Sequence, residues 1–156
     1  MPKMEVDGLE EFGAALNDIL AKSESVLKVA VYDGAHEVFE EVRHKVEMLP
    51  TTDQKSSHRD ITPEQKEGLL SGLYGSRIQT EQDGTYVYIG FTGYNSVRTK
   101  KHPKGQPNIL IARSLESGGS HMNKKPFMRQ AAATSRKRAI DAVRKTFDEE
   151  IEKLSD

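Results

Sequence analysis

The chain has 156 residues, of which 35% are hydrophobic, 30% are charged and none is cysteine. This length suits a single domain, here residues 1–156, and the lack of cysteine excludes disulfides, thiolate catalysis and Cys-ligated zinc. No apolar run approaches the ~18 residues of a membrane span and none near the start suits a signal peptide, so we expect a soluble chain with no membrane partner.

The net charge of −1 conceals a strong asymmetry along the chain. Residues 1–49 carry 5 Lys/Arg and 11 Asp/Glu, whereas residues 94–145 carry 13 Lys/Arg and 2 Asp/Glu. The last eleven residues are acidic again, with 1 Lys and 5 Asp/Glu. Such a distribution is typical of a solvated charged face, or of a surface that meets an oppositely charged partner.

Two N-terminal helices are predicted. The first covers about residues 8–21, with Asp7 as its N-cap. The second begins at a cap on Ser23 or Ser25 and ends near Leu49, before Pro50. Its apolar stripe follows spacings of three and four residues: Leu27, Val31, Ala35, Val38, Val42, Val46 and Leu49.

A short helix and a β-hairpin come next. Thr62 is the expected N-cap and Pro63 the first residue of a helix that ends around Gly72 or Gly75. Residues 76–82 and 85–91 are predicted strands on either side of Asp83-Gly84, a dipeptide that suits a two-residue turn. Both faces of the hairpin are apolar enough to be covered, one by helices and the other by a neighbouring subunit.

The rest of the chain predicts two loops and a long helix. The polar segments near residues 51–61 and 92–108 are expected to be flexible loops. Residues 109–117 form a short apolar element, either helix or strand, and a last helix runs from Pro126-Phe127 to about Leu154. The fold class is α+β: N-terminal helices and a long C-terminal helix packed on a small antiparallel sheet built around the hairpin.

Patterns typical of catalysis are not found. His36 and His44 lie farther apart than the i, i+4 spacing of a metal pair. There is no Gly-x-Ser-x-Gly elbow and no Gly-rich phosphate loop followed by Lys-Ser/Thr. We therefore predict no catalytic residue, metal ligand or cofactor, and expect a protein that is not an enzyme.

Basic residues supply the strongest candidate contacts. Arg136, Lys137 and Arg138 lie on the predicted last helix, and a second cluster lies in the preceding loop: Arg98, Lys100, Lys101, His102 and Lys104. Neither cluster is interleaved with aromatic residues or set in a helix-turn-helix pattern, so sequence-specific DNA reading is not expected. Non-specific phosphate contact and docking on an acidic protein both fit.

Four segments, taken in order, resemble one known family. They are Gly68-Leu69-Leu70-Ser71-Gly72-Leu73, Tyr86-Val87-Tyr88-Ile89-Gly90-Phe91, Ile111-Ala112-Arg113-Ser114-Leu115-Glu116-Ser117-Gly118 and Lys125-Pro126-Phe127-Met128-Arg129-Gln130-Ala131. This succession resembles the neck and tail-completion family of tailed phages, found in siphophages and prophages. The likeness spans about residues 6–154, and its most specific parts are Glu116-x-Gly118 and Pro126-Phe127-x-x-x-Ala131. One departure is Gly118-Gly119, where the family usually has Gly-Thr.

The resemblance implies a virion structural protein at the head–tail junction. Such a neck, tail-completion or terminator subunit forms a homo-oligomeric ring and joins the capsid connector or head-closure protein to the tail tube or terminator. It is located in the virion neck or tail, and in the host cytoplasm during assembly. On this interpretation the 92–108 loop, which carries the basic cluster, contacts a neighbouring ring and orders on assembly, or it lines a channel through which DNA passes.

The motif residues also have roles that follow from their chemistry. Gly118 permits a positive φ after a short apolar element. Glu116 is expected to cap a helix N-terminus or to pair with Arg129. Pro126 suits a helix start, and Phe127 anchors that helix in the core.

Two other functions remain open from the residues alone. One is a small, non-specific nucleic-acid-binding module that uses the 98–104 and 136–138 clusters. The other, the least favoured, is a hydrolase whose site has no recognisable pattern.

Overall fold

The computed structural model describes residues 9–53 and 59–156. The helices and strands of this part are α1 (Leu9–Glu47), α2 (Pro63–Gly72), β1 (Leu73–Gly75), β2 (Gln79–Glu81), β3 (Gly84–Tyr86), β4 (Ile89–Phe91), α3 (Asn108–Ser117) and α4 (Phe127–Ser155). The predicted α+β class is confirmed, with a long C-terminal helix and small antiparallel sheets. The predicted N-cap Asp7 and part of the 51–61 loop lie outside the described residues.

One continuous helix, α1, replaces the two N-terminal helices predicted from the sequence. It has 39 residues, which corresponds to about 58 Å, and it passes through Ser23 and Ser25. The predicted break was wrong because serine is only mildly unfavourable inside a helix, and neither glycine nor proline lies between residues 21 and 25. At the other end of α1, the Lys66 ammonium donates a hydrogen bond to the Leu49 carbonyl at 3.0 Å.

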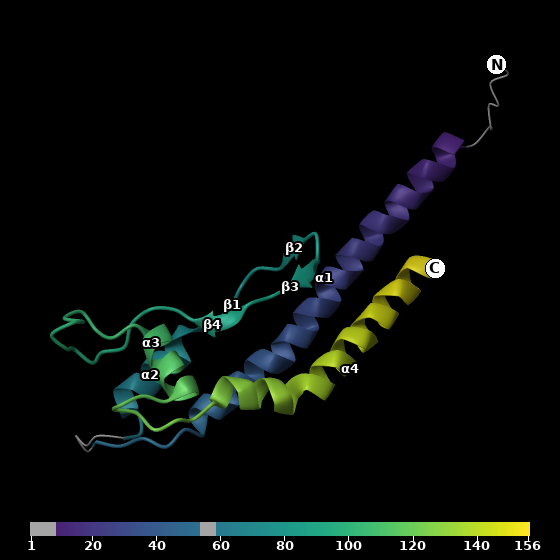
Figure 1. The fold of residues 1–156 in the computed structure, drawn as a ribbon. Coiled ribbons are helices and arrows are strands. Elements are labelled where there is room, and N and C mark those ends of the chain that lie inside the picture. Colours follow the sequence, from purple (N-terminus) through teal and green to yellow (C-terminus); the bar gives the residue numbers. More distant parts are fainter. Residues whose placement is uncertain (1–8, 54–58) are drawn as a thin grey trace.

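α4 returns antiparallel to α1 and packs along it, while the N-terminal part of α1 extends past the end of α4 (Figure 1). Between residues 13 and 38 of α1, the buried positions are Val26, Ala30 and Gly34. Leu27, which the predicted stripe placed in the interior, is 38% exposed. The predicted stripe was therefore wrong at Leu27, because α4 meets the adjacent face of α1 there.

A bend divides α4 into two parts, visible in Figure 1 as a change of direction within its first third. The fully buried Ser135 hydroxyl donates to the Ala131 carbonyl at 2.7 Å. A serine bonded to the carbonyl four residues earlier commonly bends a helix. The first part of α4 belongs to the core, and the second part follows α1.

α2 begins as predicted. The Gln65 main-chain N–H donates to the Thr62 side chain at 3.2 Å, and the Thr62 N–H donates to the Gln65 side chain at 2.9 Å. This reciprocal capping box satisfies two N–H groups that a helix start leaves unpaired. Pro63 occupies the first helical position, and the helix ends at Gly72, one of the two predicted ends.

The strands form one long hairpin in two segments. β1 pairs with β4, with Gly75 opposite Ile89, and β2 pairs with β3, with Gln79 opposite Tyr86. Between these pairs, residues 76–78 face only residues 87 and 88, so the first strand carries one extra residue. This is a β-bulge, and it interrupts both of the strands that were predicted to be continuous.

The hairpin turn lies one residue earlier than predicted. Gln82 and Asp83 form the turn, and Gly84 is already the first residue of β3, with a φ of 154°. The prediction that Asp83-Gly84 forms the turn was therefore wrong. Glycine is needed at this place because the unusual φ is at the residue that follows the turn.

The hydrophobic core occupies one end of the molecule. There α2, α3, β4 and the start of α4 meet the last turns of α1. Its buried members are Val42, Val46, Leu49, Ile61, Leu69, Phe91, Ile111, Ala112, Leu115, Met122, Phe127 and Ala131. We call this end the head, and the paired parts of α1 and α4 beyond it the arm.

Candidate assembly surfaces

The predicted basic loop connects β4 to α3 and is held by hydrogen bonds. The Asn95 N–H donates to the Gln106 carbonyl at 2.9 Å, and the Asn95 side-chain oxygen accepts from the Gln106 N–H at 3.3 Å. Farther along, Thr99 and His102 exchange two main-chain hydrogen bonds of 3.1 Å. Lys100 and Lys101 therefore form the two-residue tip of a narrow loop.

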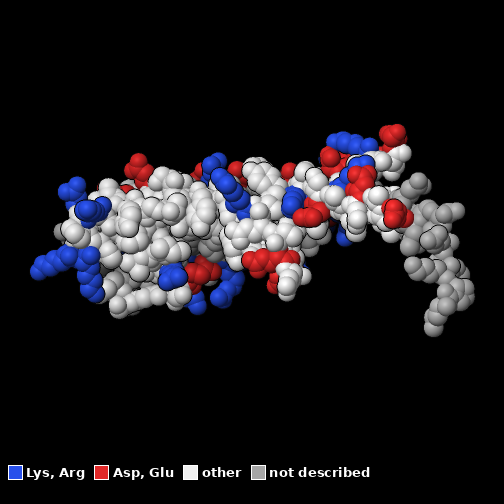
Figure 2. All heavy atoms as spheres, turned by 90° about the horizontal axis from the view of Figure 1, so that it is seen from above, with Lys and Arg blue, Asp and Glu red and all other residues white. Residues whose placement is uncertain are grey.

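The basic loop gives one end of the molecule a positive charge. Arg98, Lys100, Lys101 and Lys104 are exposed, and His102 is half-buried. Within the described residues none of these four Lys/Arg side chains forms an ion pair. Figure 2 shows Lys and Arg side chains gathered at the end of the molecule where this loop lies. All five predicted contact residues are thus brought together at one end.

The second predicted basic cluster lies elsewhere. Residues 136–138 belong to α4, well separated from the loop between β4 and α3 in Figure 1. Arg138 is engaged within the chain, with its guanidinium 2.9 Å from the Glu41 carboxylate and 3.4 Å from that of Glu37. The hydrogen bond to Glu41 raises the pKa of Arg138. The two clusters do not form one continuous basic surface.

Glu116 joins α3 to α4. Its two carboxylate oxygens accept hydrogen bonds from the main-chain N–H groups of Met128 and Arg129, each at 3.0 Å. A carboxylate at a helix N-terminus satisfies unpaired N–H groups and interacts favourably with the helix dipole. Of the two roles expected for Glu116, capping is the one observed.

The other motif residues complete this joint. Gly118 ends α3 with a φ of 75°, and a Cβ there would meet the Lys124 side chain. Pro126 immediately precedes α4, as expected for a helix start. The Phe127 ring is 2% exposed and lies edge-to-face on Phe91, with 5.8 Å between the ring centroids. Ala131 is fully buried.

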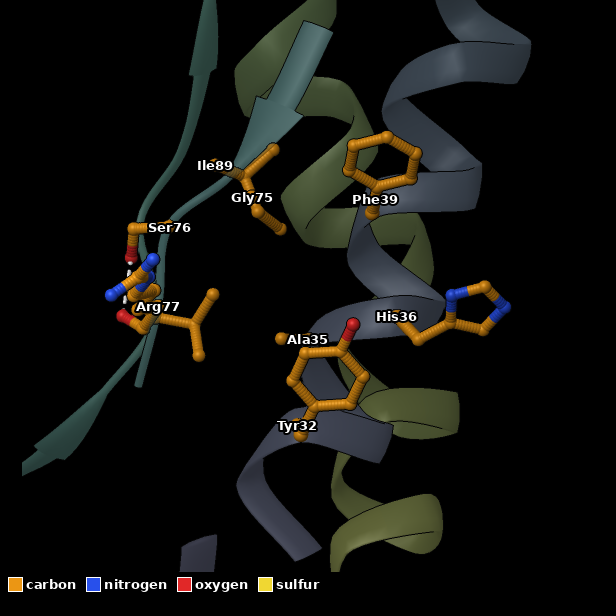
Figure 3. Close-up of a pocket in the computed structure, with 9 residues that line it drawn as sticks. Tyr32, Ala35, His36, Phe39, Gly75, Ser76, Arg77 and Ile89 are labelled. Atoms are coloured by element: carbon orange, nitrogen blue, oxygen red, sulfur yellow. Dashed lines mark hydrogen bonds between the residues drawn. The ribbon is translucent and has the colours of Figure 1, made fainter. Parts of the chain in front are cut away.

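A cavity of about 390 Å³ lies between α1 and the hairpin (Figure 3). The Ser76 hydroxyl in its wall donates to the Arg77 carbonyl at 2.9 Å and accepts from the Tyr88 N–H at 2.8 Å. His36 also lines the cavity, but Figure 3 shows its ring directed away from Ser76. The only serine and histidine in this wall are therefore not arranged as nucleophile and base.

An apolar groove of about 530 Å³ runs beside this cavity, between α1, α4 and the hairpin. It is lined by Val31, Gly34, Ala35, Val38, Val87, Ala139, Ile140, Val143, Arg144 and Phe147. Sequence reasoning missed this groove because it is made by segments that are far apart in the chain. The available signal was the small residues Gly34, Ala35 and Ala139 between larger apolar residues.

The free part of α1 carries exposed apolar side chains. Leu16 is 44%, Ile19 58% and Leu20 65% exposed. These positions follow the i, i+3, i+4 spacing, so they share one face of the helix. We call residues 13–21 the tip; it is the part of α1 without a packed neighbour in Figure 1.

No helix among the described residues is long and apolar enough to cross a membrane. The same residues contain no group of three or more His, Cys, Asp or Glu side chains placed to hold a metal ion. No family model, curated protein or solved structure matches this chain.

Proposed function

We propose that this chain is a structural subunit of the head–tail junction of a tailed phage, where it forms a ring that joins the capsid connector to the tail. The observation that carries the assembly role is the exposed apolar tip of α1. Leu16, Ile19 and Leu20 are each more than two-fifths exposed although they share one helix face. A contiguous apolar face is typical of a protein–protein contact. The phage assignment rests on the resemblance of the four sequence segments.

The elongated shape also supports this proposal. A basic loop lies at one end of the molecule, and the start of α1, where acidic and basic side chains are mixed, lies at the other (Figures 1 and 2). A subunit with two different, complementary surfaces associates head to tail, and a closed rotation then gives a ring. The basic loop faces away from the arm, where it is free to meet a neighbouring ring.

Mass measurement and imaging test the proposal. The purified chain, alone and mixed with the portal and tail-tube proteins of its own genome, is examined by native mass spectrometry and negative-stain microscopy. We expect a closed ring of one defined stoichiometry that binds at least one of those proteins. A chain that stays monomeric in every mixture, or a gene without portal and tail genes beside it, contradicts the proposal.

The exposed basic loop favours one alternative, a non-specific nucleic-acid-binding module. The variant Arg98→Gln/Lys100→Gln/Lys101→Gln/Lys104→Gln tests it. The matched control is Lys22→Gln/Lys28→Gln/Lys145→Gln/Lys153→Gln, which removes four exposed cations outside both predicted basic clusters. If the loop binds DNA, its loss lowers the slope of log affinity against log salt by about 3 to 4. If the loop only meets a neighbouring ring, ring stacking is lost and DNA affinity does not change.

A further inference from the structure

The tip of α1 and the groove of the arm are two unpartnered apolar surfaces on the same chain. The tip presents Leu16, Ile19 and Leu20 at i, i+3, i+4 spacing. The groove extends over two turns of α1, from Val31 to Val38. An apolar helix face of this spacing is the usual ligand of a groove formed by helices.

The two surfaces cannot meet within one chain. Ile140 of the groove lies beside the Gly34–Val38 part of α1, since Ala139 is next to Gly34. Ile19 is more than four helical turns away along the same straight helix, about 25 Å. If a tip docks in the groove, it must therefore come from another copy.

Charge complements this apolar fit. Residues 9–28 carry Glu10, Glu11, Asp18 and Glu24 against Lys22 and Lys28, and these two lysines pair with Asp18 and Glu24. The segment keeps a net negative charge, which lies at the start of α1. Residues 136–145 of α4 carry 5 Lys/Arg and 1 Asp, and of these Arg138 is paired with Glu41 and Glu37, and Lys145 lies 4.0 Å from Glu149. Arg144 lines the groove itself and, among the described residues, forms no ion pair. The acidic residues at the start of α1, before the tip, and Arg144 at the groove attract each other and favour one orientation of approach.

The groove also has the shape to admit a helix. Ala35 and Ala139 contribute small side chains to its wall, and Val31, Val38 and Phe147 contribute larger ones. Larger side chains of an incoming helix fit where the wall residues are small, as ridges fit into grooves. The exposed 46% of Ile140 would be covered by such a helix.

We propose that the tip of α1 of one copy docks in the α1–α4–hairpin groove of the next copy, with Leu16, Ile19 and Leu20 against the groove wall. The proposal rests on the proposed function and identifies the surfaces that build its ring. The contact is head-to-tail, so each copy gives one tip and receives another. Such a contact continues from copy to copy until the ring closes.

The absence of cysteine from the chain permits a direct test by disulfide trapping. Ile19→Cys/Ile140→Cys is oxidised over a range of protein concentrations and examined on non-reducing gels. We expect a ladder of dimers, trimers and larger species, because every copy carries both halves of the contact. A mixture of Ile19→Cys with Ile140→Cys should give dimers only. The disulfide should form more than about tenfold faster than in a control pair, because docking raises the local thiol concentration.

The control pair is Ile19→Cys/Met48→Cys, since Met48 is 69% exposed but lies on the head. Equal rates of disulfide formation in the two double variants would mean that the links form by random collision, which overturns the proposal. If the single variant Ile19→Cys forms disulfides as fast as the double variant, the tips pair with each other, and this result also overturns the proposal.

A mixing experiment gives an independent check. Leu16→Asp/Ile19→Asp makes the tip polar and unable to dock, and Ile140→Asp/Arg144→Glu places acidic side chains in the groove, so that it cannot receive a tip. Both change exposed residues outside the core, so circular dichroism should show unchanged folding. Each variant alone should remain monomeric by sedimentation velocity. Their mixture should form a 1:1 complex, because one intact tip and one intact groove remain; two monomers in the mixture contradict the proposal.

The outcomes also separate this inference from the proposed function. The unchanged chain could form a closed ring while cysteines at positions 19 and 140 form no disulfide. The ring then uses another surface. The docking inference then fails and the proposed function stands. A monomeric chain in every mixture, with no trapping, contradicts both.

Discussion

The head and the arm are built from the same two helices but are stabilised differently. In the head, α1 and α4 are enclosed by α2, α3 and the hairpin, and Val42, Val46 and Phe127 are at most 2% exposed. In the arm α1 and α4 pack mainly on each other, and large apolar residues such as Ile140 and Tyr32 remain 46% and 58% exposed. The head therefore holds most of the folding free energy, and the arm holds surface suited to a partner.

Removal of one aromatic side chain from each region should give the largest contrast. Phe127→Ala leaves a cavity in the head and should lower the free energy of unfolding by about 3–5 kcal/mol. Phe147→Ala, at a half-buried position of the arm, should cost no more than about half of that, because its ring is not enclosed. Urea unfolding measures both. Equal losses would mean that the arm is packed as densely as the head.

A pair of glycines on α1 tests how closely the two arm helices approach. A Cβ at Gly34 would meet the Val143 side chain and lie 3.1 Å from the Ala139 carbonyl oxygen. Gly34→Ala should therefore lower stability by about 1–3 kcal/mol despite the better helix propensity of alanine. Gly13→Ala is the control, because nothing lies within 4 Å of a Cβ there. It should raise local helix stability by up to about 1 kcal/mol.

Hydrogen exchange of the arm amides measures both glycine variants. Faster exchange around Val143 is expected only for Gly34→Ala. If the two variants behave alike, the helices are not in close contact at Gly34.

Glu116 tests the joint between head and arm. Glu116→Ala should lower stability by about 1–2 kcal/mol, because two N–H groups at the start of α4 lose their acceptor. Glu116→Gln should recover only part of the loss, since one amide oxygen replaces two charged ones. The control is Glu149→Ala, whose carboxylate lies 4.0 Å from Lys145 on an exposed surface and should have almost no effect. Thermal unfolding followed by circular dichroism separates these three.

The smallest effect is expected at the start of α2. Thr62→Ala removes one half of the capping box and should cost about 1 kcal/mol. Thr62→Ser is the control, because serine retains the accepting oxygen. Since α2 belongs to the head, the loss should appear in global unfolding and leave exchange in the arm unchanged. A change confined to the arm would contradict the division into two regions.

Local signals in the sequence were sufficient where a short motif decides the structure. Thr62-Pro63 gave the start of α2, and Pro126-Phe127 gave the start of α4. Local signals were insufficient where contacts between distant parts of the chain decide the structure. Ser23 and Ser25 cap helices in many proteins, but here nothing stops α1 from continuing. The bulge opposite Val87 and the groove beside it depend on α1, the hairpin and α4 coming together, which no local pattern encodes.

The candidate surfaces were predicted unevenly for the same reason. The basic loop could be named from the sequence because Arg98, Lys100, Lys101, His102 and Lys104 are close together in the chain. The role of Arg138 could not, because its partners Glu37 and Glu41 lie about a hundred residues earlier. The exposed tip also escaped prediction, since Leu16 and Ile19 have the spacing of residues that pack inside a protein.

The pairing of α1 with α4 has a consequence for the order in which the molecule forms. The Asp33 carboxylate accepts a 2.7 Å hydrogen bond from the Thr146 hydroxyl, 113 residues later in the chain. At about 5–20 residues per second, Thr146 leaves the ribosome roughly 6–23 s after Asp33. During that interval Val26 and Ala30 have no intramolecular partner. The arm is therefore the last part of a newly made chain to pack. Until α4 has emerged, the apolar face of α1 that carries Val26 and Ala30 is exposed to chaperones and to other nascent copies.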